Sequence, residues 1–411
     1  MNYELFIARR IIAGSQYKST ISSSIIKIAI SAIALGVIIM LVTIATGVGL
    51  QKKIKEKISG FNGHIQITNF EDNNSQITIS PVSTEQDFYP GFPSVSGVKN
   101  IQVFATKGGI LRTETDFEGV LLKGVGADYD WSFFTSYLIE GRTLNLTEEV
   151  SNEVLISAIT AKRLKLKLHD KCNMFFLKDD PTAAPNARSF TIVGIYNTGF
   201  QEFDEFYLLG DIRHIQRLNK WDENQVGGFE VLLDDFNQLE TKGKQIYTTI
   251  PSNLNAVTIA ERFDSIFEWL RLLDTNIIVI IGIMILIAGI NMITALLVLI
   301  LERTQMIGIL KALGSSNWSI RKVFLYNASY LIVKGLLWGN LIGLSILFAQ
   351  HYFGFIKLNP ESYYVSEAPV YLSVGYILLL NIGVLVLCML MLLIPSFIVS
   401  RISPVKAIKF D

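Results

Sequence analysis

Four long runs of apolar residues constrain this chain more than any other feature of its sequence. They cover residues 25–50, 275–301, 323–350 and 372–400. A helix needs about 20 apolar residues to cross the hydrocarbon core of a bilayer, and each run is long enough. The first run is too long for the apolar part of a signal peptide, so we expect it to remain as an anchor. The sequence therefore predicts a membrane protein with four transmembrane α-helices.

The charged residues predict how these helices are oriented. Residues 51–271 contain 23 Lys and Arg and 30 Asp and Glu, whereas the rest of the chain contains 13 basic and 6 acidic residues. The basic residues gather before the first span, between the second and third spans, and after the fourth. Because short basic loops stay in the cytoplasm, we expect segments 1–24, 302–322 and 401–411 on that side. Segments 51–274 and 351–371 then lie on the other side.

Segment 51–274 is long enough to form a domain with its own core. Strand-like stretches such as HIQITNF and FTIVGIY alternate with helix-like stretches such as SNEVLISAITAKRLKLKL and FNQLETKGKQIYTTI. This alternation predicts an α+β domain in two lobes. QKKIKEKISG is expected to extend the first span as a helix, and apolar residues spaced by three and four from Ile259 to Leu273 predict a helix leading into the second. Interfacial amphipathic helices are the alternative for both.

The sequence contains no motif of a common catalytic site. It has no G-x-x-x-x-G-K-[ST], G-x-S-x-G or H-E-x-x-H pattern, which excludes a Walker A nucleotide site and two common hydrolase sites. The two cysteines and four histidines are widely spaced and predict no metal site. The acidic residues are interpreted as a solvated surface. We expect no catalytic residue, no cofactor, no metal and no nucleic-acid partner, and hence a protein that is not an enzyme.

The segment ERTQMIGILKALGSS, between the second and third spans, has the pattern of a short helix. Its apolar residues recur at helical steps, and Gly314 is a natural stop. Such a helix lies on the bilayer surface or fits a groove on another protein. In the second case we expect Ile307 and Leu310 as apolar anchors, with Lys311 and Arg303 at the rim. The residues expected to form the contact are Glu302, Arg303, Met306, Ile307, Leu310, Lys311, Leu313 and Gly314.

Small residues four positions apart predict close helix packing in two spans. Gly335, Gly339 and Gly343 share one face of the third span, and Ala32 and Gly36 share one face of the first. Such faces let helices approach closely, within one chain or between two chains, although glycine is common in membrane helices in any case.

Lys334 is the only full charge deep inside a span. A charged side chain at this depth is costly and is often functional. We expect Lys334 to face protein or water rather than lipid. The alternative is that its side chain snorkels to the membrane surface or pairs locally.

Several longer segments, spread over almost the whole chain, carry a family resemblance. They are ERTQMIGILKALGSSNWSIRKVFLYNASYL, IKLNPESYYVSEAPV, IPSFIVSRISPVKAIKFD, GFNGHIQI and NTGFQEFDEFYLLGDI. The chain thereby resembles the FtsX-type permease family, and within it the LolC/LolE lipoprotein-release branch. The resemblance implies the type VII architecture of ABC transporters in the cell inner membrane, with a large periplasmic domain between the first two spans, as in MacB and LolCDE.

The resemblance also implies partners. Two permease chains, identical or related, pair with two cytoplasmic ATPase subunits that bind ATP and Mg²⁺ and contact segment 302–322, the coupling helix. ATP energy then extracts lipoproteins from the outer leaflet and passes them to a periplasmic carrier. KDDPTAAPNAR is similar in position to the carrier-binding hook of one permease type. It is short and lacks the pattern of that hook, which argues against direct docking of the carrier by this chain.

A path for the lipoprotein substrate is implied as well. Lipid-anchored substrate is expected to enter sideways between the first two spans, where Val42, Val48, Ile277 and Val279 are compatible with acyl chains. Ordinary lipid-facing residues are the alternative. Two other functions stay open within the family: MacB-like efflux, and FtsX-like mechanotransmission that regulates cell-wall hydrolases.

Overall fold

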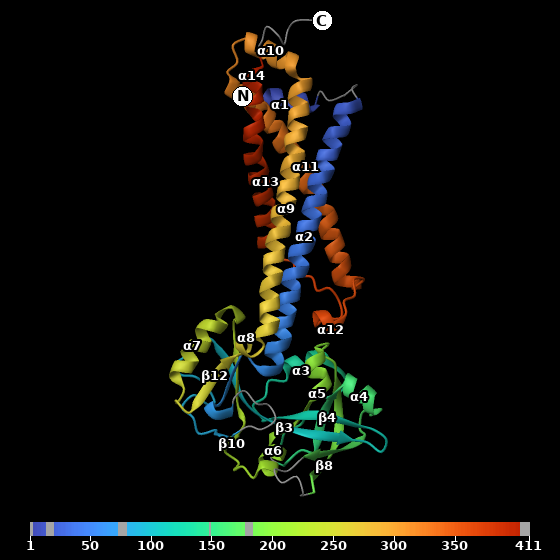
Figure 1. Ribbon diagram of the computed structural model, residues 1–411, viewed down its shortest axis with the longest axis vertical. Coiled ribbons are helices and arrows are strands. Elements are labelled where there is room, and N and C mark those ends of the chain that lie inside the picture. Colours follow the sequence, from blue (N-terminus) through green and yellow to red (C-terminus); the bar gives the residue numbers. More distant parts are fainter. Residues whose placement is uncertain (1–2, 14–19, 73–79, 148, 177–183, 403–411) are drawn as a thin grey trace. The chain divides into compact units, whose positions relative to one another are not determined.

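Figure 1 shows a computed structural model of the chain, which describes residues 3–13, 20–72, 80–147, 149–176 and 184–402. The described residues form two compact units. One, called here the helical unit, comprises the described parts of Met1–Gln51, Trp269–Lys357 and Glu367–Asp411. The other, called the sheet unit, comprises those of Lys52–Glu268 and Leu358–Ser366.

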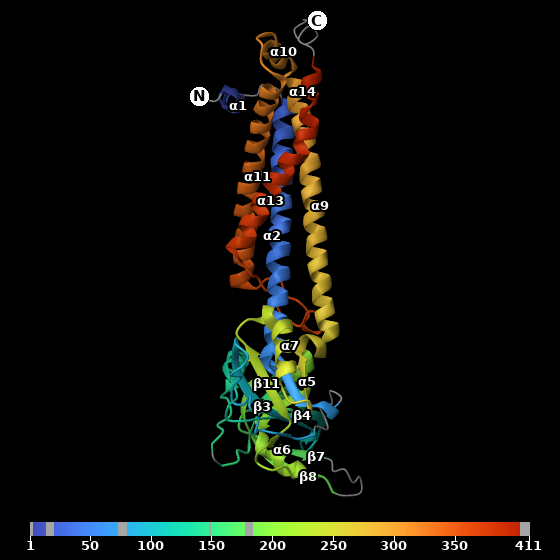
Figure 2. The same cartoon turned by 90° about the vertical axis from the view of Figure 1, so that its left-hand side faces the viewer.

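Long helices lie side by side in the helical unit (Figures 1 and 2). They are α2 (Thr20–Asn62, up to Gln51 in this unit), α9 (Asp264–Glu302), α11 (Asn317–Phe353) and α13 (Val374–Ser396). Within the described residues, four helical segments are long and apolar enough to cross a membrane, and the fourth runs on through α14 (Ile398–Arg401). The predicted four-span architecture is therefore confirmed.

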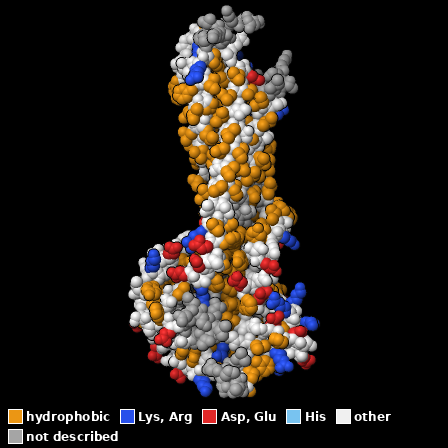
Figure 3. All heavy atoms as spheres, in the orientation of Figure 1, with side chains coloured by type: hydrophobic (Ala, Val, Ile, Leu, Met, Phe, Trp, Pro, Cys, Tyr) orange, Lys and Arg blue, Asp and Glu red, His pale blue; other side chains and the backbone are white. Residues whose placement is uncertain are grey.

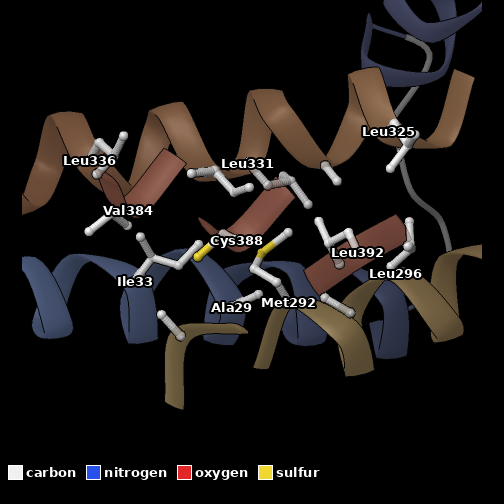
Figure 4. Close-up of a cluster of buried hydrophobic side chains, with 14 of the residues drawn as sticks. Ala29, Ile33, Met292, Leu296, Leu325, Leu331, Leu336, Val384, Cys388 and Leu392 are labelled. Carbon is white, nitrogen blue, oxygen red and sulfur yellow. The ribbon is translucent and has the colours of Figure 1, made fainter. Parts of the chain in front are cut away.

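A buried apolar core joins these helices. Figure 4 shows Ala29 and Ile33 of α2 opposite Met292 and Leu296 of α9, with side chains of α11 and α13 completing the cluster. In Figure 3, hydrophobic side chains also cover the visible outer surface of the helical unit. An apolar exterior around an apolar core is what a bilayer-embedded bundle requires, because lipid tails solvate apolar side chains.

Helices continue beyond the apolar runs at both junctions with the sheet unit. Helix α2 is unbroken to Asn62, as expected for QKKIKEKISG. Helix α8 (Ile259–Arg262) starts with a capping box in which Thr258 and Glu261 bond each other's backbone, and only Phe263 separates it from α9. The helical pattern read from Ile259 onwards is thus present, with a one-residue interruption.

Two shorter helices belong to the helical unit. Helix α10 (Thr304–Ala312) occupies the segment between α9 and α11. Helix α1 (Tyr3–Ala13) packs against the first turns of α11 through Ala8, which is buried against Val323. The helix α1 is not among the elements expected from the sequence of segment 1–24.

The sheet unit is built on one large mixed sheet. In the described residues its strand order is β12-β1-β11-β3-β4-β9-β6-β8-β5, and β7 pairs with both β3 and β8. The strands are β1 (Ile65–Asn69), β3 (Val98–Arg112), β4 (Phe117–Val125), β5 (Leu138–Gly141), β6 (Glu153–Ser157), β7 (Lys171–Phe176), β8 (Asn186–Tyr196), β9 (Tyr207–Asp211), β11 (Gly228–Leu233) and β12 (Leu254–Thr258). A separate ribbon pairs β2 (Val82–Ser83) with β10 (Gln225–Val226).

The long strand β3 lies inside this sheet and pairs with three other strands, β11, β4 and β7. Its first half, Val98–Phe104, pairs with β11, and its last residues, Ile110–Arg112, pair with β7. Through β4, β9, β6, β8 and β7 the pairing returns to β3, so these described strands close into a ring. These described strands thus form one continuous sheet, and the division into two lobes expected from the sequence stays a prediction.

The sheet unit also contains short helices and turns. They are η1 (Phe70–Asp72), α3 (Ser132–Tyr137), α4 (Ala158–Leu164), α5 (Gln201–Phe206), α6 (Ile212–Asn219), η2 (Phe236–Gln238), α7 (Leu239–Thr249) and α12 (Pro360–Tyr363). The helix expected in FNQLETKGKQIYTTI is α7. The stretch SNEVLISAITAKRLKLKL is helical only in its second half, since its first half forms β6. Most of KDDPTAAPNAR lies outside the described residues.

Candidate functional site

Helix α10 is closed by a tight C-terminal turn at Gly314. The Gly314 N–H donates to the Lys311 carbonyl and the Ser315 N–H donates to the Leu310 carbonyl, both at 3.0 Å. Gly314 has φ +87°, a left-handed conformation that favours glycine. Ser316 then caps α11 by accepting a bond from the Ser319 N–H. These local bonds turn the chain directly from α10 into the third span.

The apolar residues of α10 point to two different sides. Ile307 is fully buried in the core of the helical unit, and Met306 and Leu310 pack against the same core. Ile309 is 47% exposed and Leu313 78% exposed. The expectation that Ile307 anchors a partner protein does not agree with its burial, because a side chain inside its own core is unavailable to another chain. The accessible apolar pair is Ile309 and Leu313.

Lys311 bonds within its own chain. Its Nζ donates to the carbonyl oxygens of Ser400 and Ile402, at 3.2 and 2.8 Å. These carbonyls end α14, where the helix dipole favours a positive charge. Lys311 therefore connects α10 to the end of the fourth span. The sequence led us to expect Lys311 at the rim of a contact with another protein and did not indicate these bonds within the chain. Of the other expected contact residues, Glu302 is exposed and Arg303 is half-buried between α9 and α10.

Arg321, which is not among the residues expected from the sequence to be functional, makes a second connection to the fourth span. Its side chain is buried, its Nε donates to Ser396 Oγ at 3.0 Å, and its guanidinium lies 3.7 Å from the centre of the Phe397 ring. Pro395 lies inside α13 and has no N–H for the helix ladder. An arginine beside one span and a proline near the end of another were the available signals in the sequence.

The glycines of α11 pack against α2 of the same chain. A Cβ added at Gly335 would come 2.7 Å from Ile33 Cβ, and one at Gly339 would come 2.7 Å from Val37 Cβ. Gly343 is less tight, with Leu41 at 3.1 Å. Gly36 instead lies near Met284 of α9, and Ala32 is half-buried. The two expected small-residue faces thus lie in different contacts.

Lys334 points away from the core of its own bundle. Its side chain is exposed, with Nζ 4.5 Å from the centre of the Tyr330 ring. A role for Lys334 toward protein or water stays a prediction.

The side-chain amides of Asn340 on α11 and Asn381 on α13 form two reciprocal hydrogen bonds, of 2.6 and 3.0 Å. This pair fixes the register of these two spans.

The residues expected along a substrate path differ in their exposure, and the path itself stays a prediction. Val42 packs against the buried core and Val48 is half-buried. Val279 is 52% exposed. Ile277 lies so close to Gly47 that an added Cβ there would come 2.5 Å from Ile277 Cδ1. The first two spans are therefore in close contact near Gly47 and Ile277.

The sheet unit contains a buried ion pair. Lys123 Nζ lies 2.6 Å from Glu230 Oε1, with the two side chains 2% and 0% exposed. Lys123 also donates to the carbonyl of Phe61 in the last turn of α2, and Gln66 and Gln102 donate to Glu230. Burial lowers the pKa of Lys123, and the charge of Glu230 opposes that shift. The network joins the end of α2 to β1, β3, β4 and β11.

A second buried carboxyl, Asp204, holds the loop before α5. It accepts bonds from Thr198 Oγ1 at 2.7 Å and from the Gly199 N–H at 2.9 Å. Burial raises the pKa of Asp204 to about 6 in spite of these bonds.

Among the described residues no group of His, Cys, Asp and Glu side chains is arranged to hold a metal ion.

The geometry defines a polytopic membrane protein with one large mixed-sheet domain inserted between its first and second spans. The family model described as FtsX-like permease C-terminal matches residues 278–404, and that described as MacB-like periplasmic core domain matches residues 28–256. The second match covers more than half of the chain. The chain therefore belongs to the FtsX-type family of ABC-transporter permeases that carry a MacB-like periplasmic core domain.

Known proteins are similar in sequence to this chain over almost its full length. The lipoprotein-releasing system transmembrane protein LolC of Neisseria meningitidis is 22% identical, over 95% of both chains. The corresponding LolE protein of Haemophilus influenzae is 22% identical, over 99% of both chains. Among solved structures, the periplasmic region of MacB from Actinobacillus actinomycetemcomitans is 16% identical with a TM-score of 0.35, and covers 53% of this chain and 98% of that one.

Proposed function

We propose that this chain is the permease subunit of an ATP-driven complex that releases lipoproteins from the outer leaflet of the inner membrane. One observation carries the proposal. Similarity to LolC and LolE proteins extends over 94–99% of both chains and includes the spans as well as the sheet unit. A protein related only through its large domain would not match along the spans.

Both termini and α10 are proposed to face the cytoplasm, and the sheet unit the periplasm. Basic residues near the first span, in the loop with α10 and after the fourth span support this orientation. The complex would include cytoplasmic ATPase subunits that bind ATP and Mg²⁺, a second permease chain, and a periplasmic carrier that receives the lipoprotein. The permease itself would then contribute binding and movement rather than hydrolysis.

Helix α10 is the proposed contact with the ATPase. Ile309 of α10 and Leu313 at its C-cap are exposed apolar side chains, and an amphipathic helix commonly docks in a groove of a partner through such anchors. Ile307 and Leu310 would support this face from the core side. The bonds of Lys311 to the end of α14 would pass a movement of α10 to the fourth span.

Substitution of Leu313 by Asp tests the coupling contact. A carboxylate there would be buried without a partner, and we expect the affinity for the ATPase to fall roughly 5- to 150-fold, for a cost of roughly 1–3 kcal/mol, with a matching loss of co-purification. Tyr247→Asp, at an exposed aromatic of α7, is the matched control and should leave co-purification unchanged. Equal recovery of the ATPase with both variants would refute the assignment of α10.

Release of lipoproteins is tested by reconstitution. Proteoliposomes with the permease and its ATPase should discharge a radiolabelled lipoprotein to a soluble carrier only when ATP is present. The match to the MacB-like periplasmic core domain favours efflux of periplasmic peptides or small molecules as the alternative. ATP-driven extrusion of a soluble peptide, with no discharge of lipoprotein, would replace the proposal with that alternative.

A further inference from the structure

Helix α1 is anchored on one face at the start of the third span. Ala8 is 1% exposed and contacts Val323, and Ile7 and Met306 pack around this pair. Figure 2 shows α1 beside the end of α11 that adjoins α10. The helix therefore has one buried side and a defined location within the helical unit.

Polar bonds fix the orientation of α1. Ser319 Oγ donates to Glu4 Oε1 at 2.9 Å, and Lys322 Nζ lies 3.7 Å from the same carboxylate oxygen. The hydroxyls of Tyr3 and Ser315 are hydrogen-bonded at 3.3 Å. These bonds attach α1 to the turn that links α10 to α11.

The exposed face of α1 combines apolar with basic side chains. Leu5 and Phe6 are 39% and 45% exposed, and Arg9 and Arg10 are exposed as well. With 3.6 residues per turn, Phe6 and Arg10 lie opposite Ala8, and Leu5 and Arg9 lie on the adjoining flank, so the four form one continuous exposed face. Large apolar side chains next to arginines are typical of helices that lie in a membrane surface.

The anchoring point places this face at the border of the bilayer. Val323 is the first residue of the third apolar run, and Arg321 and Lys322 directly precede it. A helix held at this level lies beside lipid headgroups, because the hydrocarbon core begins where the apolar run begins. Arginine binds phosphate oxygens through several N–H donors at once.

We propose that the exposed face of α1 binds anionic phospholipid at the membrane surface, with Arg9 and Arg10 on the phosphates and Leu5 and Phe6 in the acyl boundary. Since Tyr3 and Glu4 bond Ser315 and Ser319, lipid bound there also steadies the turn after α10. The inference goes beyond lipoprotein release, and it holds for any cargo of the permease.

A spin label at position 6 measures the contact. The two native cysteines are buried, so Phe6→Cys and the reference Leu313→Cys can each be labelled selectively in the full-length chain. In vesicles containing phosphatidylglycerol, the label at position 6 should collide several-fold more with oxygen than with a water-soluble nickel chelate. The label at position 313, studied without ATPase, should show the reverse ratio.

Charge variants identify the lipid phosphate as the ligand. Arg9→Gln combined with Arg10→Gln should make the label at position 6 accessible to the chelate, as should replacement of phosphatidylglycerol by phosphatidylcholine. Lys162→Gln combined with Lys167→Gln, two exposed residues of the sheet unit, makes the same charge change and should have no effect. Free inorganic phosphate in phosphatidylcholine vesicles should not restore protection. A label at position 6 that is water-accessible in all vesicles, or equally protected in both lipids, would overturn the proposal.

Discussion

Gln51 on α2 donates a hydrogen bond from Nε2 to Asp274 Oδ1 on α9, at 2.7 Å. The same amide reaches the Leu270 carbonyl at 3.3 Å, and Gly47 and Ile277 touch one turn further along. The first two spans are thus joined by a polar bond and a close apolar contact. If substrate enters between them, these contacts must separate in every cycle.

A reversible disulfide between Gly47→Cys and Ile277→Cys is expected to stop transport. An added Cβ at Gly47 lies 3.1 Å from Ile277 Cγ1, so the two sulfurs can meet with little backbone movement. Lipoprotein discharge should cease on oxidation and return on reduction, whereas each single cysteine should respond to neither. Full discharge by the oxidised double variant would show that substrate does not pass between α2 and α9.

Loss of one partner from the Lys123–Glu230 pair should destabilise the sheet unit strongly. Lys123→Met leaves Glu230 buried without its counter-charge, at an expected cost of about 3–5 kcal/mol in the free energy of unfolding. Lys99→Met is the control, because it breaks an exposed pair with Asp130 worth about 0–1 kcal/mol. Urea unfolding followed by tryptophan fluorescence measures both. Equal stability of the two variants would mean that the buried charge is compensated in another way.

Asp204 should make stability depend on pH between about 4 and 6. Its folded-state pKa of about 6 lies above the usual value of 3.8, so protonation favours the folded state. The contribution is complete below the unfolded pKa and is lost as pH rises through the folded pKa, by up to about 3 kcal/mol. Relative to Asp204→Asn, the wild-type chain should therefore lose stability from pH 4 to 6.5. A constant difference over this range would contradict the raised pKa.

Leucine at Gly339 should disrupt the packing of α11 on α2. A Cβ there would already come 2.7 Å from Val37 Cβ and 2.9 Å from the Ala34 carbonyl oxygen, so the helices must move apart, at an expected cost of about 1–3 kcal/mol. Gly282→Leu is the control, because no heavy atom lies within 4 Å of a Cβ at that position. Thermal unfolding in detergent should separate the variants, and equal midpoints would exclude a packing role for Gly339.

The strongest periodic signals predicted the structure best. The four spans emerged from the length of their apolar runs, and α7 from an ordinary helical pattern. SNEVLISAITAKRLKLKL misled because apolar residues at helical steps continue back into the strand β6. Helix α1 has only eleven residues, and tertiary packing through Ala8 stabilises so short a helix more than its sequence does.

The orientation of α10 could not be predicted from its own residues. Met306, Ile307, Ile309 and Leu310 lie on one broad face of the helix, with Ile307 and Ile309 at its opposite edges, so the sequence does not mark which edge is buried. Only the neighbouring spans decide that Ile307 faces inward and Ile309 outward. The targets of Lys311 are backbone carbonyls 89 and 91 residues away along the chain. Carbonyl acceptors are the same at every residue, and sequence therefore gives no indication of them.

Lys311 and Arg321 connect the segment between the second and third spans to the end of the fourth span. Lys311 lies within α10 and Arg321 in the second turn of α11, and both bond to the last turns of the fourth span. A force applied to α10 would thus be transmitted to three spans, α9, α11 and α13. The force would act on the end of the fourth span, next to Pro395. Pro395 has no N–H, so one backbone hydrogen bond of the helix is already missing there. How far the four spans move together would accordingly depend on the side chains of Lys311 and Arg321.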